Sequence, residues 1–178
     1  MLFPPQDKDK TYSIGLDASL TSFGVYCHPI GHEEWYGFVV QSTARDGNDT
    51  TRVLDMASSV IESIDALPYR PAIAGIEDYG PINRTSGKVA QRAELIGILK
   101  HHLLRVVGIP LITVPPKSLK SYATGNGNSG KEDMLTAANK QGYYPDTHDE
   151  ADAFFAARAA ATLHKGQRID VSFARVNP

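Results

Sequence analysis

The segment 148–164 constrains the fold of this chain more than any other stretch. It has the length of a long helix, and its apolar face is made mostly of small residues, Ala153, Phe154, Ala156, Ala157, Ala160 and Ala161. Such a face indicates a helix packed closely against a sheet. Asp149 and Asp152 stand three residues apart near its start, so they share one face, one turn from each other. Each also has an ordinary structural explanation, because Asp149 can cap the helix and Asp152 can complement the positive end of its dipole.

Two further acids end apolar runs far upstream. Residues 12–17 alternate as a strand does and end in Asp17, and residues 71–77 form a buried-strand pattern that ends in Glu77. If both strands belong to one sheet, their ends can lie side by side, with the start of the helix docked over them. Four uncompensated carboxylates would repel one another, so we expect them to be gathered in order to hold cations. Oxygen ligands alone select hard metals, with Mg²⁺ or Mn²⁺ the natural choices.

The order of the expected elements predicts an α/β fold. Strands are expected at 12–17, 22–28, 34–40, 71–77 and 109–114, and helices at about 50–64, 86–107, 117–123, 131–141 and 148–164. The first three strands should be antiparallel, whereas a strand–helix–strand crossover should add parallel neighbours. We therefore expect a mixed five-stranded sheet flanked by helices. Residues 1–178 should form a single domain, with a core at about 11–164 and an irregular tail at 168–178.

Composition limits the classes of partner only weakly. The net charge of the 178 residues is −2, but it becomes +2 when the four acids are set aside, so charge does not exclude nucleic acid. Cys27 is the only cysteine, which rules out an internal disulfide and fits a reducing compartment. Residues 1–10 are polar, and no apolar run approaches the length of a membrane span. We expect an intracellular, cytoplasmic protein that does not enter a membrane.

Basic residues gather around a glycine-rich loop. Lys117, Lys120 and Lys131 lie beside residues 124–130, whose backbone can approach a phosphate closely. Three further basic residues, Arg84, Lys88 and Arg92, lie at the start of the expected helix 86–107 and could follow a DNA backbone. Basic residues on helices are more often simply solvated. The role of His148, beside the first helix acid, is left open.

Together these blocks resemble the RuvC family of Holliday-junction resolvases, within the ribonuclease H-like fold, and especially its phage-encoded members. The residues that carry the resemblance are 15–17 with 22–25, then 75–77, then 117–120 with 124–131, then 148–153. The resemblance covers roughly residues 12–163. It implies that the four acids hold metal ions, that Lys120 and Lys131 are active-site lysines, and that a homodimer acts on four-way DNA junctions. The family commonly has Pro-Gly after the first acid, where this chain has Ala18 and Ser19.

The expected function is therefore a metal-dependent DNA endonuclease that resolves four-way junctions by paired symmetric nicks. Two Mg²⁺ ions, replaceable by Mn²⁺, would serve a two-metal hydrolysis. Family members probe the junction centre with an aromatic side chain after the second acid, and Tyr79 stands near that place. Forks and flaps are alternative substrates. The protein could be phage-encoded and act in a bacterial host.

Two other classes of protein fit the sequence less well. A non-catalytic junction-binding protein would not need all four acids and the lysines. The actin-like ATPases share the pattern of residues 16–19, but they require two duplicated subdomains, for which this chain is too short. For the resolvase, the expected dimer interface is the helix 86–107, where Leu95, Ile98, Leu99 and Leu103 exceed what one sheet face can cover.

Overall fold

The computed structural model describes residues 10–42, 49–78 and 87–178. Six strands form one sheet in the order β3-β2-β1-β4-β5-β6. Their bounds are β1 Thr11–Asp17, β2 Ser22–Ile30, β3 Tyr36–Gln41, β4 Pro71–Glu77, β5 Leu111–Val114 and β6 Ala174–Val176. The strands β1, β2 and β3 pair antiparallel, and β1, β4 and β5 pair parallel. The expected α/β fold with a mixed sheet is thus confirmed.

The sixth strand was not expected. β6 lies within the segment 168–178, for which the sequence predicted an irregular tail, and it pairs antiparallel with β5. Without it, β5 would have no partner along its outer edge. A buried strand needs partners for its backbone N–H and C=O groups. The three residues of β6 therefore pair with β5, although their sequence does not predict a strand.

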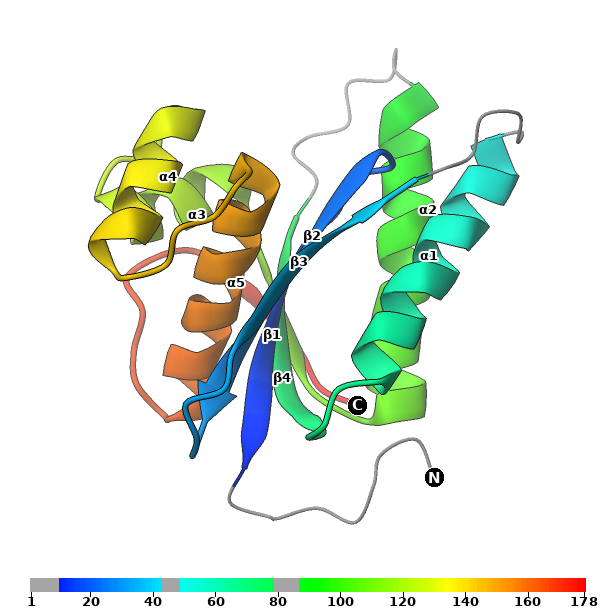
Figure 1. Cartoon of the computed structure of the whole chain (residues 1–178), viewed down its shortest axis with the longest axis horizontal. Coiled ribbons are helices and arrows are strands. Elements are labelled where there is room, and N and C mark those ends of the chain that lie inside the picture. The colour runs from blue at the N-terminus through cyan, green and yellow to red at the C-terminus, as the bar shows by residue number, and fades with distance from the viewer. Residues whose placement is uncertain (1–9, 43–48, 79–86) are drawn as a thin grey trace.

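Helices cover both faces of the sheet (Figure 1). Their bounds are α1 Asp49–Asp65, α2 Gly87–His101 with the π-helical turn η1 His102–Val107, α3 Pro116–Thr124, α4 Lys131–Lys140 and α5 His148–His164. The helices α1 and α2 lie on one face, and α3, α4 and α5 lie on the other (Figure 1). None of the described helices combines the length and the apolarity needed to cross a bilayer.

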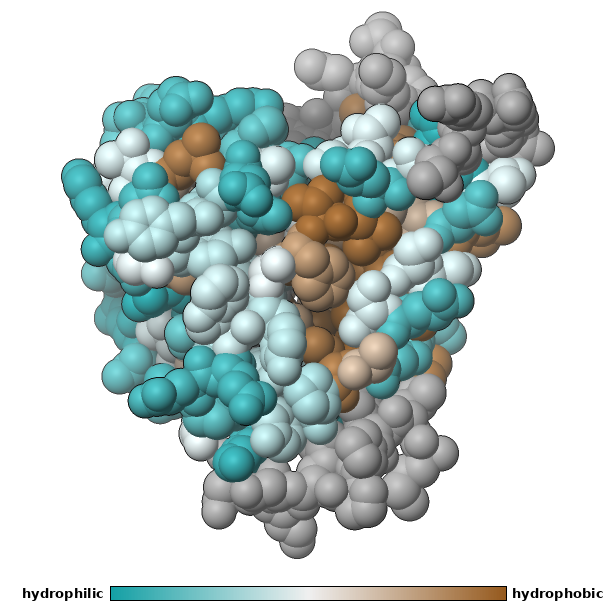
Figure 2. Space-filling view, viewed as in Figure 1, coloured by the Kyte–Doolittle hydropathy of each residue, from teal (hydrophilic) through white to brown (hydrophobic). Residues whose placement is uncertain are grey.

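The core between the sheet and the α1–α2 layer accounts for the leucines that the sequence assigned to a dimer interface. Leu95, Leu99 and Leu103 are at most 1% exposed in the single chain, where they belong to the core cluster shared with β1 and α1. That assignment is therefore wrong, because α1 covers the face left over by the sheet. Hydrophobic residues also show along the seam between β3 and α1 (Figure 2), where Phe38 and Val40 are only partly buried.

His102 is buried in this layer, and its Nε2 lies 3.0 Å from Asp65 Oδ1 on α1. The helix changes to π-helical turns at this residue. A π-helix has more residues per turn than an α-helix, so positions after the change no longer follow the 100° spacing of an α-helix.

The helix α5 lies unusually close to the sheet, as its alanine face predicted. A Cβ atom added to Gly15 of β1 would lie 1.8 Å from the carbonyl oxygen of Ala153, so only glycine allows this approach. Gly24 of β2 meets the carbonyl oxygen of Asp149 in the same way, at 2.2 Å. Buried Ser13 also donates a hydrogen bond of 2.7 Å to the carbonyl oxygen of Ala157. These contacts fix the first turns of α5 relative to the strand ends.

Candidate active site

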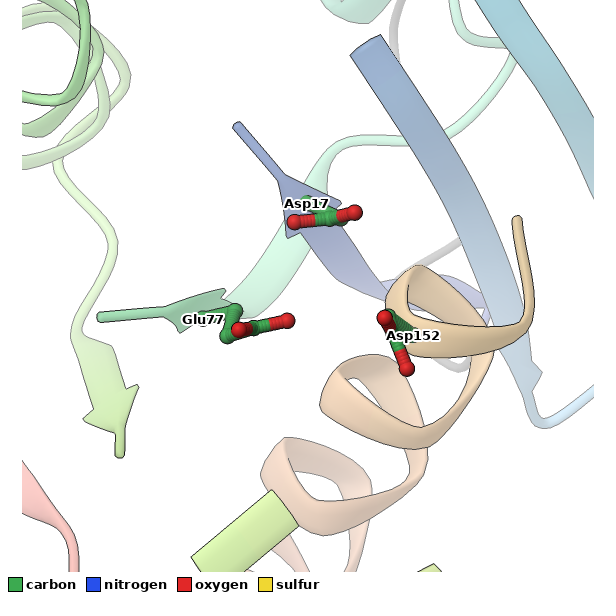
Figure 3. Close-up of side chains that lie close together, drawn as sticks. All are labelled: Asp17, Glu77 and Asp152. Atoms are coloured by element: carbon green, nitrogen blue, oxygen red, sulfur yellow. The ribbon is translucent and has the colours of Figure 1, made fainter. Parts of the chain in front are cut away.

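Three carboxylates converge at one end of the sheet. Asp17 ends β1, Glu77 ends the parallel neighbour β4, and Asp152 lies on the first turns of α5. One oxygen atom from each lies within 4.8 Å of the others. The three side chains come from separate elements and point toward a common space (Figure 3). Asp17 and Glu77 are 6% and 9% exposed, so the cluster is largely shielded from water.

The fourth predicted acid lies beside this cluster. Asp149 stands one helical turn before Asp152 and lines the same cleft, but it does not belong to the group within 4.8 Å. It is not the helix cap, because the Thr147 side chain accepts the hydrogen bond from the backbone N–H of Glu150. Capping therefore does not explain Asp149. Its carboxylate instead lies 3.3 Å from His148 Nε2.

Burial and mutual repulsion shift the acidity of the cluster. Burial raises the pKa of Asp17 well above its ordinary range, and the nearby Glu77 and Asp152 carboxylates raise it further, against a lowering by Arg92. Burial and then Asp152 raise the pKa of Glu77 to about 7. Burial likewise raises the pKa of Asp152 to about 6, although His148 counteracts it. The cluster thus lacks enough positive charge from the protein alone.

The donor set fits a divalent cation. Buried carboxylates that are short of positive charge bind either a proton or a cation, and an all-oxygen set prefers a hard ion. The acids Asp17, Glu77 and Asp152 would be its ligands, and Asp149 lines the same cleft.

Two lysines lie on the α3–α5 side of the acids. The charge of Lys120, on α3, lowers the pKa values of both Glu77 and Asp152, which places it near these carboxylates. Lys131, the first residue of α4, lines the cleft, and its Nζ lies 2.6 Å from His148 Nε2. The ammonium donates this hydrogen bond when the ring proton is on Nδ1. His148, whose role was left open, therefore connects Lys131 with the start of α5.

Arginines occupy the opposite side. Arg92 of α2 was predicted to follow a DNA backbone, but its Nη2 lies 3.2 Å from Asp17 Oδ1. Arg52 of α1 was not singled out from the sequence, since it stands alone among polar residues and carries no motif. The cleft they share has a volume of about 700 Å³, and its lining is Asp17, Ala18, Ser19, Leu20, Thr21, Arg52, Glu77, Gln91, Arg92, Lys131, His148, Asp149 and Asp152.

The remaining predicted DNA contacts are not among the described residues that line this cleft. Lys117 is exposed on α3 and is not among the described residues that line it. Tyr79 and Arg84 lie outside the described residues. Lys88 belongs to α2, but the description does not extend to its side chain.

Comparisons with known proteins agree with this arrangement of sheet and helices. No family model matches the chain. The solved structure of Thermus thermophilus RuvC superposes with a TM-score of 0.62, covering 86% of this chain and 96% of that one, at 21% identity. The chain has the RuvC fold. Similar RuvC-fold structures include T. thermophilus RuvC in complex with a Holliday junction substrate, with a TM-score of 0.65, 20% identity and coverage of 88% and 96%. The yeast mitochondrial Holliday junction resolvase Ydc2 gives 0.55 at 14% identity, with coverage of 81% and 75%.

The sequence is also similar to curated RuvC proteins. The crossover junction endodeoxyribonuclease RuvC of Anaeromyxobacter sp. (strain K) is 34% identical over 115 residues, which are 61% of this chain and 57% of that protein. RuvC of Anaeromyxobacter dehalogenans (strain 2CP-C) is 33% identical over the same shares. The resemblance to RuvC is thus confirmed, and the chain spans little more than half the length of the curated relatives that it matches.

Proposed function

We propose that this protein is a metal-dependent DNA endonuclease that resolves four-way junctions by paired, symmetric nicks. The convergence of Asp17, Glu77 and Asp152 within 4.8 Å, on a RuvC fold, is the observation that carries the proposal. The relatives named above are crossover junction endodeoxyribonucleases, and one RuvC structure holds a Holliday junction substrate. An acid cluster with these pKa shifts has no evident purpose in the fold alone, since it destabilises the ionised protein.

The acids would hold two Mg²⁺ ions, for which Mn²⁺ could substitute. When bound, such a pair activates a water molecule and stabilises the leaving oxygen of a phosphodiester. Asp17 is 6% exposed and Glu77 is 9% exposed, and Asp152 offers the third ligand atom of the group within 4.8 Å. Asp149 completes the set from the neighbouring turn of α5.

The lysines would act on the phosphodiester rather than on the metals. Lys131 stabilises charge that develops on the reacting phosphate or the leaving oxygen, and the His148 contact orients its ammonium. Lys120 neutralises part of the negative charge around Glu77 and Asp152 and holds the neighbouring phosphate. Beyond the cleft, Lys117, Lys88 and Arg84 remain proposed contacts to the DNA backbone, and Tyr79 the proposed probe of the junction centre.

Two symmetric nicks require two active sites, which a two-fold dimer would supply. Since Leu95 and Leu99 of α2 are buried in the single chain, our candidate face for a partner is an apolar hollow of about 490 Å³ between α1 and α2. Its lining is Thr50, Val53, Leu54, Glu94, Gly97, Ile98 and His101. Leu54 is 51% exposed, so Leu54→Glu should shift the mass in solution from dimer to monomer without unfolding the chain. An unchanged mass would place the interface elsewhere.

A panel of labelled substrates tests the function directly. Wild-type protein with Mg²⁺ should cut opposing strands of a four-way junction in pairs, and Asp152→Asn should abolish the cutting while still binding the junction. Asp170→Asn is the matched control, because that side chain is 92% exposed and lies outside the cleft. Preference for forks or flaps over four-way junctions would indicate a branched-DNA nuclease of the same fold. Binding without metal-dependent cutting would indicate a junction-binding protein instead.

A DNA substrate also implies where the protein works. We infer action inside a cell, and the resemblance to phage-encoded RuvC proteins extends this to a phage protein acting in its bacterial host. Junctions that accumulate in cells lacking the protein would support that setting.

A further inference from the structure

The cleft over the acids has two basic rims, and only one of them has a role in the proposed function. Lys131 and His148 form the rim on the side of α4 and α5. Arg52 from α1 and Arg92 from α2 form the rim on the opposite side of the sheet. These two helical layers lie on opposite faces of the sheet, with the acid-bearing ends of β1 and β4 between them (Figure 1).

The two arginines are not equivalent. Arg92 is engaged with an acid, since its Nη2 lies 3.2 Å from Asp17 Oδ1, and its charge lowers the pKa values of Asp17 and Glu77. Arg52 has no ion pair with any described residue, although it lines the same cleft as four carboxylates. Its Nε atom, like that of Arg92, is buried and has no hydrogen-bond partner among the described residues, so the missing ion pair is what distinguishes Arg52.

An unpaired guanidinium group inside a cleft lowers the stability of the protein unless a ligand binds it. A buried donor without a partner loses its hydrogen bonds to water and gains nothing in return. A guanidinium presents a planar fork of donors that matches phosphate oxygens, and it keeps its charge at all relevant pH values. The acids below the rim form no ion pair with it in the described structure, and in the proposed function their charge is taken up by the metal ions.

We propose that Arg52 binds a phosphate of the cleaved DNA strand. This phosphate is the neighbour of the one that is cut, and it lies on the side of the cleft opposite Lys131. This inference rests on the proposed function and adds to it a strand-positioning contact from α1. The strand crosses the acid cluster with its reacting phosphate over the carboxylates, so its neighbouring phosphate on the α1–α2 side comes to Arg52. Arg52 thereby fixes the position of the strand without taking part in the chemistry.

Binding measurements separate this role from general attraction between charges. All proteins carry Asp152→Asn, so that a labelled four-way junction stays intact during titration. Adding Arg52→Gln should weaken binding about tenfold or more, and it should reduce the slope of log Kd against log salt by about one. The matched control is Arg105→Gln, which removes the same charge from an exposed position on η1, away from the cleft. The control should change neither quantity.

A second experiment identifies the phosphate. Each phosphate near the cut is replaced in turn by an uncharged methylphosphonate, and the loss of affinity is compared with and without Arg52→Gln. Replacement at one position on the α1–α2 side should lower the affinity of the protein that retains Arg52. The same replacement should not lower the affinity of Arg52→Gln any further. If Arg52→Gln melts early, the same cycle with Arg52→Lys keeps the charge and should still lose affinity, because lysine lacks the two-pronged fork.

The two proposals fail in different ways. If wild-type protein neither binds nor cuts the junction, the proposed function falls. If wild-type protein cuts the junction, but Arg52→Gln binds as Arg105→Gln does or no phosphate position couples to Arg52, then this inference alone is overturned.

Discussion

Replacing Gly24 with alanine should displace the start of α5 and thereby weaken metal binding at the acid cluster. An added Cβ would lie 2.2 Å from the carbonyl oxygen of Asp149, whereas ordinary contact begins near 3.4 Å. Either β2 or the first turn of α5 must therefore move by about 1 Å, and the Asp149 and Asp152 carboxylates move relative to Asp17. Overpacking of this kind costs about 1–3 kcal/mol of stability.

The assay combines thermal melting with a calorimetric titration of Mn²⁺. Small divalent ions demand close to ideal octahedral geometry, so we expect the affinity of Gly24→Ala to fall at least tenfold, or about 1.4 kcal/mol. Gly97→Ala is the control, because an added Cβ on that helical glycine meets no atom within 4 Å. It should leave metal affinity unchanged and raise stability by about 0.5–1 kcal/mol. Wild-type melting and wild-type Mn²⁺ affinity in Gly24→Ala would refute the view that the close approach of α5 fixes the site.

Three further results are expected. In chelator, the melting temperature should fall as the pH rises from about 4.5 to about 7, because the raised pKa of Glu77 favours folding of the protonated form. The contribution of this group to stability, roughly 3 kcal/mol, is present at low pH and is lost as the carboxyl ionises. A melting temperature that rises over this range would contradict the burial of the cluster. At pH 8, Mg²⁺ should raise the melting temperature of the wild type more than that of Asp152→Asn, and equal increases would mean that the ion binds elsewhere. Lys131→Ala should lower the single-turnover cleavage rate more than junction affinity, and the opposite pattern would reduce Lys131 to a backbone contact.

Patterns with a short period predicted most of the fold. The strands that end in Asp17 and Glu77 and the alanine face of α5 were identified because each pattern is local and reflects burial on one side. Their meeting at one end of the sheet followed from the rule for parallel neighbours. The approach of Asp17, Glu77 and Asp152 could thus be anticipated before their distances were known.

What the sequence did not predict depends on contacts between distant elements. The strand β6 forms because β5 needs an edge partner, and its own residues carry almost no strand signal. His102 is buried where α1 packs beside this part of the helix, and its Nε2 lies 3.0 Å from Asp65 Oδ1. Arg92 reaches Asp17, and Arg52 lines the same cleft, because α1 and α2 pack side by side, and neither residue belongs to a motif.

The separation of the acids along the chain also has a consequence for synthesis of the protein. Asp17 ends the first strand, while Asp152 belongs to the last helix. The strands β1 to β5 precede α5, so they can pair while the ribosome is still adding residues, but the cluster forms only after α5 has emerged and docked. A nascent or prematurely ended chain that lacks α5 has Asp17 and Glu77 without their partner. Such a chain cannot gather the proposed ligands of the metal ions, so the proposed hydrolytic activity would begin only once α5 has docked.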